Sequence, residues 1–231
     1  MARLPRLGVA GWHHLVIQQV HDGQALARDD TDRQALLEAL REAARTHRVL
    51  VHAHDVGSSS LVLLVTPESA DGISLLMQAV GRRYVATYNR RHARQGGLWA
   101  GRYRGTVLEP ARYLLDAMVY VETRTSAPSD GGAANGSPWS SAPHHLGLRT
   151  DPLVTDPPAF WALGNTPFER QAAWRLRLQD GLSASRQREF SEAMHKGWAL
   201  MGPEQQLALE GVVGRRLSPR PRGRPRKPTE A

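Results

Sequence analysis

Residues 49–65 read VLVHAHDVGSSSLVLLV, two runs of β-branched and aliphatic residues joined by a short glycine and serine segment. Runs of this composition are typical of strands, and the segment between them has room only for a turn, so the stretch predicts a β-hairpin. The second run, from Leu61 to Val65, is apolar at every position and therefore on both faces of the strand. A strand of that kind belongs in the middle of a sheet whose two faces are both covered.

The sequence on either side of this hairpin predicts alternating strands and helices. Asp29–Asp32 supplies acidic residues for a helix start, and Thr31 with Gln34 matches a capping box for a helix that runs to about Ala44. Together with the hairpin, the expected elements are strands at 11–20 and 105–108 and helices at 73–92 and 110–124. The order β-α-β-β-α-β-α predicts an α+β protein with a ferredoxin-like antiparallel sheet.

The second half of the chain changes character. Residues 125–143 are rich in Ser, Gly, Ala and Pro and predict a flexible linker or loop between a domain at 1–124 and a helical extension at 144–214. Thr166, Pro167 and Glu169 form a capping-box helix start, and two more short helices are expected at 182–197 and 203–214. Residues 215–231 form a basic tail that we expect to be disordered.

Composition excludes several classes of protein. The chain has 231 residues, of which 41% are apolar, so it can bury a substantial core. It has no cysteine, which excludes disulfides, thiolate metal sites and cysteine nucleophiles. No stretch has the apolar length of a membrane span and the N-terminus is a poor secretory signal, so we expect a cytoplasmic, nucleoid-associated protein that does not bind membranes.

The net charge of +8 is concentrated in two blocks. Residues 215–227 carry seven cations and no acid, as do residues 82–104, whereas the rest of the chain has a net charge of −6. Localised basic surfaces favour a nucleic-acid partner over a merely solvated charged face. The first block also contains aromatic rings that could stack on bases, which predicts DNA contacts from Arg82, Arg83, Arg90, Arg91, Arg94, Arg102, Arg104, Tyr88, Trp99 and Tyr103.

The basic tail contains the sequence Arg222-Gly223-Arg224-Pro225, which matches the AT-hook pattern. Glycine lets the backbone enter a narrow minor groove, and the flanking Arg222 and Arg224 would lie along A·T tracts, where the negative potential is strongest. The alternative is a generic basic tail, because electrostatic attraction alone needs only the charges.

Several longer strings point to one family. They are MARLPR at 1–6, the histidine pair 13–14, the aspartate pair 29–30, GRRY at 81–84, YNRRH at 88–92, LWAGRY at 98–103, RYLL at 112–115, WSS at 139–141, WALGNTPFER at 161–170, KGWAL at 196–200 and GRPRK at 223–227. With these strings the chain resembles the REP-associated tyrosine transposases, relatives of the single-tyrosine HUH transposases of bacterial insertion sequences. The resemblance covers nearly the whole chain.

The resemblance implies chemistry on single-stranded or hairpin DNA. A tyrosine attacks a backbone phosphate to form a phosphotyrosine link, and two histidines in a His-hydrophobic-His motif, with a polar amide, hold a divalent metal such as Mg or Mn. In this sequence the nucleophile position is Tyr120, and the three ligand positions hold Ser60, Val62 and Arg124. Valine has no donor atom and arginine would repel a metal. The resemblance therefore implies a DNA-binding protein that has lost its metal site and needs no cofactor.

Two other interpretations stay open. His52-Ala53-His54 is itself a His-hydrophobic-His triplet, and His54, helped by Asp55 or His14, could supply a relocated metal site for an active transposase that uses Tyr120. Alternatively, the protein is a regulator that recognises duplex A·T tracts mainly through its tail. The sequence leaves open the oligomeric state, for which a monomer is one option, and whether the protein is an enzyme.

Overall fold

The computed structural model describes residues 6–124 and 137–219. Their elements are β1 (His13–Gln19), α1 (Asp30–Thr46), β2 (Val49–Val56), β3 (Ser60–Pro67), α2 (Gly72–Arg91), β4 (Arg104–Leu108), α3 (Pro110–Glu122), α4 (Ala142–His145), α5 (Pro158–Trp161), α6 (Pro167–Asp180), α7 (Ala184–Lys196) and α8 (Pro203–Val213).

The four strands form one antiparallel sheet in the order β2-β3-β1-β4. Residues 49–65 form the predicted hairpin, in which His54 pairs with Leu63 and a bulge separates Val51 from Ala53. The prediction that the second strand is central is confirmed, because β3 lies between β2 and β1 and Leu61–Val65 are fully buried. The element order and this strand order confirm the predicted α+β, ferredoxin-like fold.

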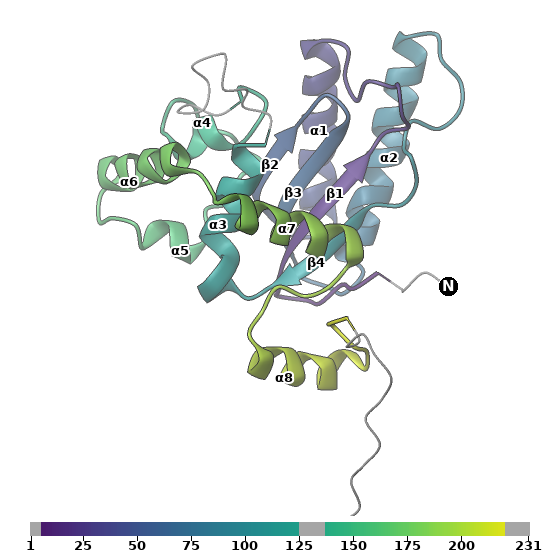
Figure 1. Ribbon diagram of the computed structural model, residues 1–231. Helices are drawn as coiled ribbons and strands as arrows, with labels where there is room; N and C mark the ends of the chain where they lie inside the picture. Colours follow the sequence, from purple (N-terminus) through teal and green to yellow (C-terminus); the bar gives the residue numbers. More distant parts are fainter. Residues whose placement is uncertain (1–5, 125–136, 220–231) are drawn as a thin grey trace, which may run out of the picture.

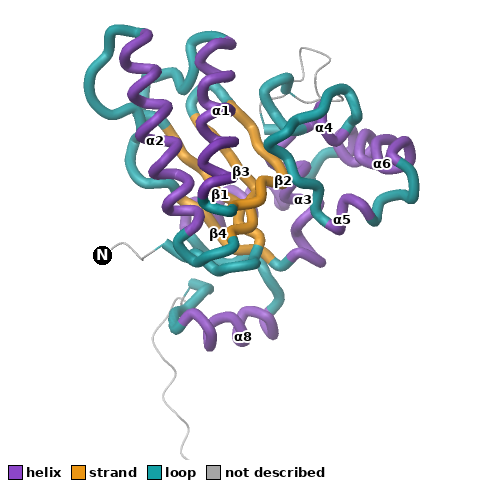
Figure 2. The backbone as a smooth tube through the Cα atoms, turned by 180° about the vertical axis from the view of Figure 1, so that it is seen from behind, coloured by secondary structure: helices purple, strands orange, loops and turns teal. Residues whose placement is uncertain are grey.

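Both faces of the sheet are covered by helices. In Figure 1, α7 and α3 lie in front of the sheet, and Figure 2 shows α1 and α2 over the opposite face. Successive residues of β1 point to opposite faces of the sheet. Val16 packs with side chains of α1 and α2, whereas Leu15 and Ile17 pack with side chains of α3 and α7. A third, smaller cluster joins Val107 of β4 to Leu209 of α8.

Three local predictions have different outcomes. The capping box at the start of α6 is confirmed, because Thr166 and Glu169 exchange both hydrogen bonds. The capping box from Thr31 is wrong, because α1 begins two residues earlier than that cap requires, with Asp29 accepting from the backbone N–H of Asp32 at 3.0 Å. An aspartate with extended backbone geometry serves equally well as a cap, and here it comes first along the chain.

The predicted linker or loop at 125–143 is described only from residue 137, and residues 125–136 lie outside the described part of the chain. Residues 137–143 pack against the edge of β2, where the Val56 N–H donates to the Trp139 carbonyl and Ser140 forms a bridge with Asp55. The helices that follow do not form a separate layer, because Trp174 and Phe190 belong to the same buried cluster as Leu15 and Ile17. In the part of the chain that the structure describes, no helix has the length and apolarity needed to cross a membrane.

Candidate functional site

Tyr120 lies near the C-terminal end of α3, on the sheet face that α7 also covers (Figure 1). Its ring is 7% exposed and packs against Phe190 of α7, with 5.3 Å between the ring centroids. The Tyr120 hydroxyl accepts a hydrogen bond from Arg124 Nη1 at 3.1 Å, one helical turn later. The ring is therefore held by packing, and its oxygen lies beside a guanidinium group.

Tyr120 and Arg124 line a cavity of about 730 Å³ between the end of α3 and helices α6 and α7, which we call the Tyr120 cavity. Arg188 of α7 lines it as well. The other polar side chains in its wall come from Thr123, Gln179, Gln187 and Ser191, and no Asp or Glu is among the lining residues. The wall of the cavity, as far as the structure describes it, therefore carries two positive charges and no negative charge.

Ser60 and Val62 lie at the start of β3, and both are buried. Val62 belongs to the same apolar cluster as Tyr120, Phe190 and Met194. A divalent metal needs oxygen or nitrogen donors, which Val62 lacks, and Arg124 adds a positive charge where the third ligand is expected. The residues at these three positions therefore do not fit a metal. Among the described residues, no group of three or more His, Cys, Asp or Glu side chains could hold one.

The histidines of the 52–54 triplet have separate structural partners. His52 contacts the Thr155 carbonyl at 2.7 Å through Nδ1 and Thr66 Oγ1 at 2.9 Å through Nε2. His54 is fully buried, and its Nε2 donates to Asp151 at 2.8 Å. Both side chains therefore serve packing on β2. A relocated metal site at His54 would first have to break the bond to Asp151.

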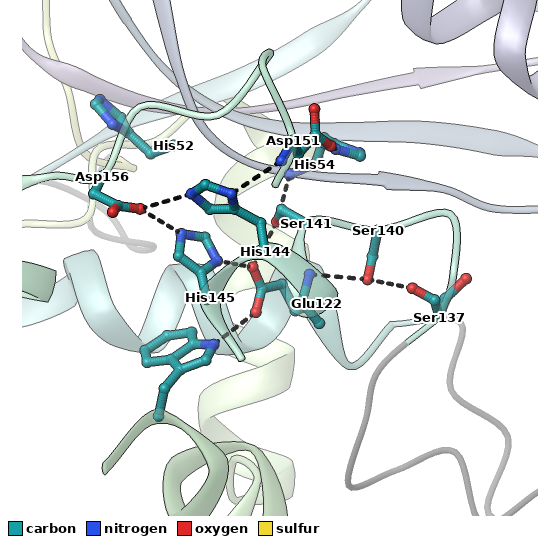
Figure 3. A network of polar contacts seen from close by, with 12 residues as sticks. His52, His54, Glu122, Ser137, Ser140, Ser141, His144, His145, Asp151 and Asp156 are labelled. Atoms are coloured by element: carbon teal, nitrogen blue, oxygen red, sulfur yellow. Dashed lines mark hydrogen bonds and ion pairs between the residues drawn. The ribbon is translucent and has the colours of Figure 1, made fainter. Parts of the chain in front are cut away.

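A buried polar network lies next to this region, and Figure 3 shows it as sticks. Its centre is Glu122, two residues after Tyr120, which accepts from Ser141 Oγ at 2.5 Å, His145 Nδ1 at 2.5 Å and Trp174 Nε1 at 2.8 Å. Asp156 Oδ1 lies 3.3 Å from Nε2 of both His145 and His144.

The network closes into a ring. The backbone N–H of Asp151 donates to His144 Nδ1 at 3.1 Å, the Asp151 carboxylate accepts from His54, and the His54 N–H donates to Ser141 Oγ at 3.1 Å. We call this closed set the polar ring; its members are Glu122, Ser141, His54, Asp151, His144, Asp156 and His145. It joins α3, α4 and β2 to residues 151–156 (Figure 3).

His145 supplies positive charge next to two of the three carboxylates in the polar ring. Burial alone would lower the pKa of His145, but the carboxylates of Glu122 and Asp156 raise it to about 9. The same contacts, from His144 and His145, hold the pKa of Asp156 well below its ordinary value. His145 is therefore an imidazolium between two carboxylates, an arrangement that is stable in a buried site only while all partners are present.

The seven arginines of the first basic block divide into two groups. Three have partners within the protein: Arg83 pairs with Glu42, Arg91 pairs with Asp29 and Asp32, and Arg94 donates to the Asn89 and Gln24 side chains. Arg82, Arg90 and Arg102 are exposed and have no ion pair among the described residues, and Arg104 donates to His195 Nδ1 at 3.2 Å. Arg82, Arg90, Arg102 and Arg104 are therefore the better candidates for phosphate contacts.

Two of the three aromatic residues predicted to stack on bases are covered. The Tyr88 ring is 2% exposed and its hydroxyl donates to the Ala25 carbonyl, so the prediction of base stacking does not fit its burial. Tyr103 is 9% exposed, and Arg6 lies 4.2 Å from its ring centroid. Trp99 is half-buried against Tyr84 and Gly81, and its stacking role stays a prediction.

Comparison with known proteins finds similarity only to solved structures. No protein-family model matches the chain, and no curated protein matches it. A solved structure of a REP-associated tyrosine transposase bound to a REP hairpin matches with a TM-score of 0.54 and 15% sequence identity, over 69% of this chain and 96% of the other. The protein has the fold of a REP-associated tyrosine transposase.

A second structure, that of a proposed transposase from Deinococcus radiodurans, has 24% identity and a TM-score of 0.35, and covers 55% of this chain and 100% of that one. Within the transposase fold, the structure brings the predicted nucleophile Tyr120 and the predicted ligand position Arg124 into direct contact. Arg188 and the polar ring were missed from the sequence, because nothing in the pattern of an exposed helix or a Ser- and Pro-rich loop marks them. Arg222 and Arg224 lie outside the described residues.

Proposed function

We propose that this protein binds single-stranded or hairpin DNA with the fold of a single-tyrosine transposase and without the metal site of that family. The observation that carries the proposal is the replacement of all three metal-ligand positions by Ser60, Val62 and Arg124, on a chain that keeps an exposed set of arginines. The hairpin bound in the solved transposase structure supports hairpin DNA as the ligand to test first.

The test is the salt dependence of hairpin binding. Replacing Arg82, Arg90 and Arg102 together by Gln removes three predicted phosphate contacts, so the slope of log affinity against log salt should fall by about 2. The matched control replaces Arg41, Arg45 and Arg177, which are exposed and lie outside the basic block at 82–104. Equal slopes for the two triple variants, measured by fluorescence anisotropy, would contradict this DNA-binding surface.

A second candidate function is strand cleavage and transfer by Tyr120, which its place beside Arg124 in an open cavity favours. The Tyr120 oxygen would displace a DNA hydroxyl from a backbone phosphate and leave a phosphotyrosine link. A covalent adduct with a hairpin oligonucleotide that is absent in Tyr120→Phe would establish this activity. A variant with Ser60→His, Val62→His and Arg124→Asn tests whether the lost ligands alone explain an inactive wild type.

The tail supplies a separate contribution. Arg222 and Arg224 would add a minor-groove contact on A·T-rich duplex DNA, and a regulator of A·T tracts would depend on that contact most. Deleting residues 220–231 should then lower affinity for an A·T-rich duplex while affinity for the hairpin is largely kept. A loss restricted to hairpin DNA would contradict a role of the tail in duplex binding.

A further inference from the structure

We propose that the Tyr120 cavity binds a phosphate group of DNA without a divalent metal, through the guanidinium groups of Arg124 and Arg188. The identity of the ligand as DNA rests on the proposed function. The cavity's preference for an anion rests on its own composition. In this arrangement two cations of the protein supply the positive charge that a metal supplies in related enzymes.

The first support is the charge of the wall. Arg124 and Arg188 line the cavity together with hydroxyl and amide side chains, and no carboxylate lines it. The larger cavity of about 930 Å³ beside α1 and β2 gives a contrast, because Glu38, Glu42 and Glu68 offset most of the charge of the arginines in the same wall. Of these two cavities, the smaller therefore has positive charge that no carboxylate among its described lining residues offsets.

The second support is the availability of the two side chains. Neither Arg124 nor Arg188 forms an ion pair with any described carboxylate. The carboxylate one turn after Arg188, that of Glu192, pairs with Lys196 at 2.6 Å, and the nearby charge of Arg188 also lowers the pKa of Glu192. A guanidinium group has five N–H donors, and Arg124 gives one of them to the Tyr120 hydroxyl. Both groups can therefore offer paired donors to phosphate oxygens.

The third support is the rigidity of the surroundings. Phe190 of α7 is fully buried and contacts the rings of both Tyr120 and Tyr113, which fixes α7 relative to α3. Ser183 caps α7 by accepting from the Arg186 N–H, and Arg186 bridges to Asp116 of α3 at 2.8 Å. The end of α3 that leads to Arg124 and the helix that carries Arg188 are thus held in place before any ligand arrives, which lowers the entropic cost of binding.

Charge near the cavity extends towards β4. Arg104 Nη1 donates a hydrogen bond to His195 Nδ1 of α7. Burial, together with the positive charges of Arg104 and Arg124, lowers the pKa of His195. The histidine is therefore neutral and can accept this hydrogen bond. A DNA strand that runs from Arg104 to the Tyr120 cavity would therefore contact Arg104 near one end of α7 and Arg124 and Arg188 at the cavity. His195, being neutral, would add no further charge.

The test measures binding of small phosphate probes in the presence of a metal chelator. The probes are inorganic phosphate, a thymidine tetranucleotide with a 5′-phosphate and the same tetranucleotide without one, which distinguish a free anion, a terminal phosphate and an internal phosphodiester. We expect the tetranucleotides to bind with chelator present. Arg124→Gln and Arg188→Gln should each weaken binding by about tenfold and lower the salt slope by about 0.7.

Arg177→Gln is the matched control, because Arg177 is exposed on α6 and does not line the cavity. Unfolding temperatures verify that each variant is folded. Absence of binding with all three probes, binding only after a divalent metal is added, or equal losses in Arg177→Gln would overturn the proposal. If the probes bind but hairpin DNA does not, the proposed function is contradicted and the proposed phosphate site is supported.

If hairpin binding is the same in Arg124→Gln and Arg188→Gln as in the wild type, but depends on Arg82, Arg90 and Arg102, the phosphate site is contradicted. In that case the proposed hairpin-binding function is still supported.

Discussion

His145 lies between the carboxylates of Glu122 and Asp156 inside the protein, and it sets how stability depends on pH. Its pKa is about 9 in the folded state, against about 6.5 in an unfolded chain. Between these two values only the folded state holds the proton. The free energy of unfolding therefore falls as the pH rises from 6.5 to 9, by on the order of 3 kcal/mol.

His13 and His14 act in the opposite direction. Burial lowers the pKa of each to about 4, so between pH 4 and 6.5 the unfolded state holds protons that the folded state lacks. Stability from these two residues is lost as the pH falls. Together with His145 they predict a stability maximum near pH 6.5, which urea unfolding at a series of pH values would reveal.

Replacing His145 by Gln is the direct test of the polar ring. The variant leaves the buried Glu122 carboxylate without a cation and removes one of the two histidines beside Asp156, so it should lose about 3–5 kcal/mol at pH 6.5. It should also lose the fall in stability between pH 6.5 and 9. His21→Gln is the control, because that side chain is exposed. A variant that keeps the wild-type slope above pH 6.5 would show that His145 does not carry this proton.

At the scale of elements, Arg91 joins two helices. It ends α2 and pairs at 2.6 Å with Asp32 in the first turn of α1, a carboxylate that His92 and the Arg28 N–H also contact. Arg91→Gln should therefore lower the free energy of unfolding, because it removes one partner of the buried Asp32 carboxylate. Arg90→Gln, one residue earlier and exposed, should leave stability unchanged and weaken hairpin binding instead. Equal stability losses in both variants would contradict this division.

The elements also show what the sequence can predict. Apolar runs identified the hairpin and the central place of β3, because strand patterns depend on neighbours that are local in sequence. Residues 137–143 have the composition of a linker, yet they pair with β2, since backbone hydrogen bonds at a sheet edge need no particular side chain. The burial of Tyr88 and Tyr103 was missed for a related reason, because an aromatic ring suits a core as well as a base.

For the candidate site, sequence predicted Tyr120 and the absence of metal ligands at Ser60 and Val62, because those positions follow from the resemblance. The Tyr120 cavity could not be predicted. Arg188 reaches it only because α7 packs across the same face of the sheet as α3, a contact between segments about 70 residues apart. The helical extension therefore contributes to the site as well as to the fold.

At the scale of the whole molecule, the sheet depends on the second half of the chain. Trp174, Leu178, Phe190 and Met194 are buried in the cluster that contains Leu15 and Val62. Burying four such side chains contributes on the order of 10 kcal/mol, which is comparable to the net stability of a typical domain. We expect residues 1–124 alone to aggregate or stay unfolded, as circular dichroism and size-exclusion chromatography would show. A monomeric, folded fragment would contradict this view of the extension.

The polar ring has a consequence for how the chain can be divided. Two of its members, His54 and Glu122, come from the first part of the chain, and the other members come from residues 141–156. Within the polar ring, these two groups of residues are joined by hydrogen bonds and ion pairs. These links themselves need no covalent bond between the two sides. Residues 1–124, unfolded on their own, should therefore fold when mixed with a separately produced piece that begins at residue 137, and the protein would then serve as a split reporter whose halves associate through buried charge and the shared apolar cluster.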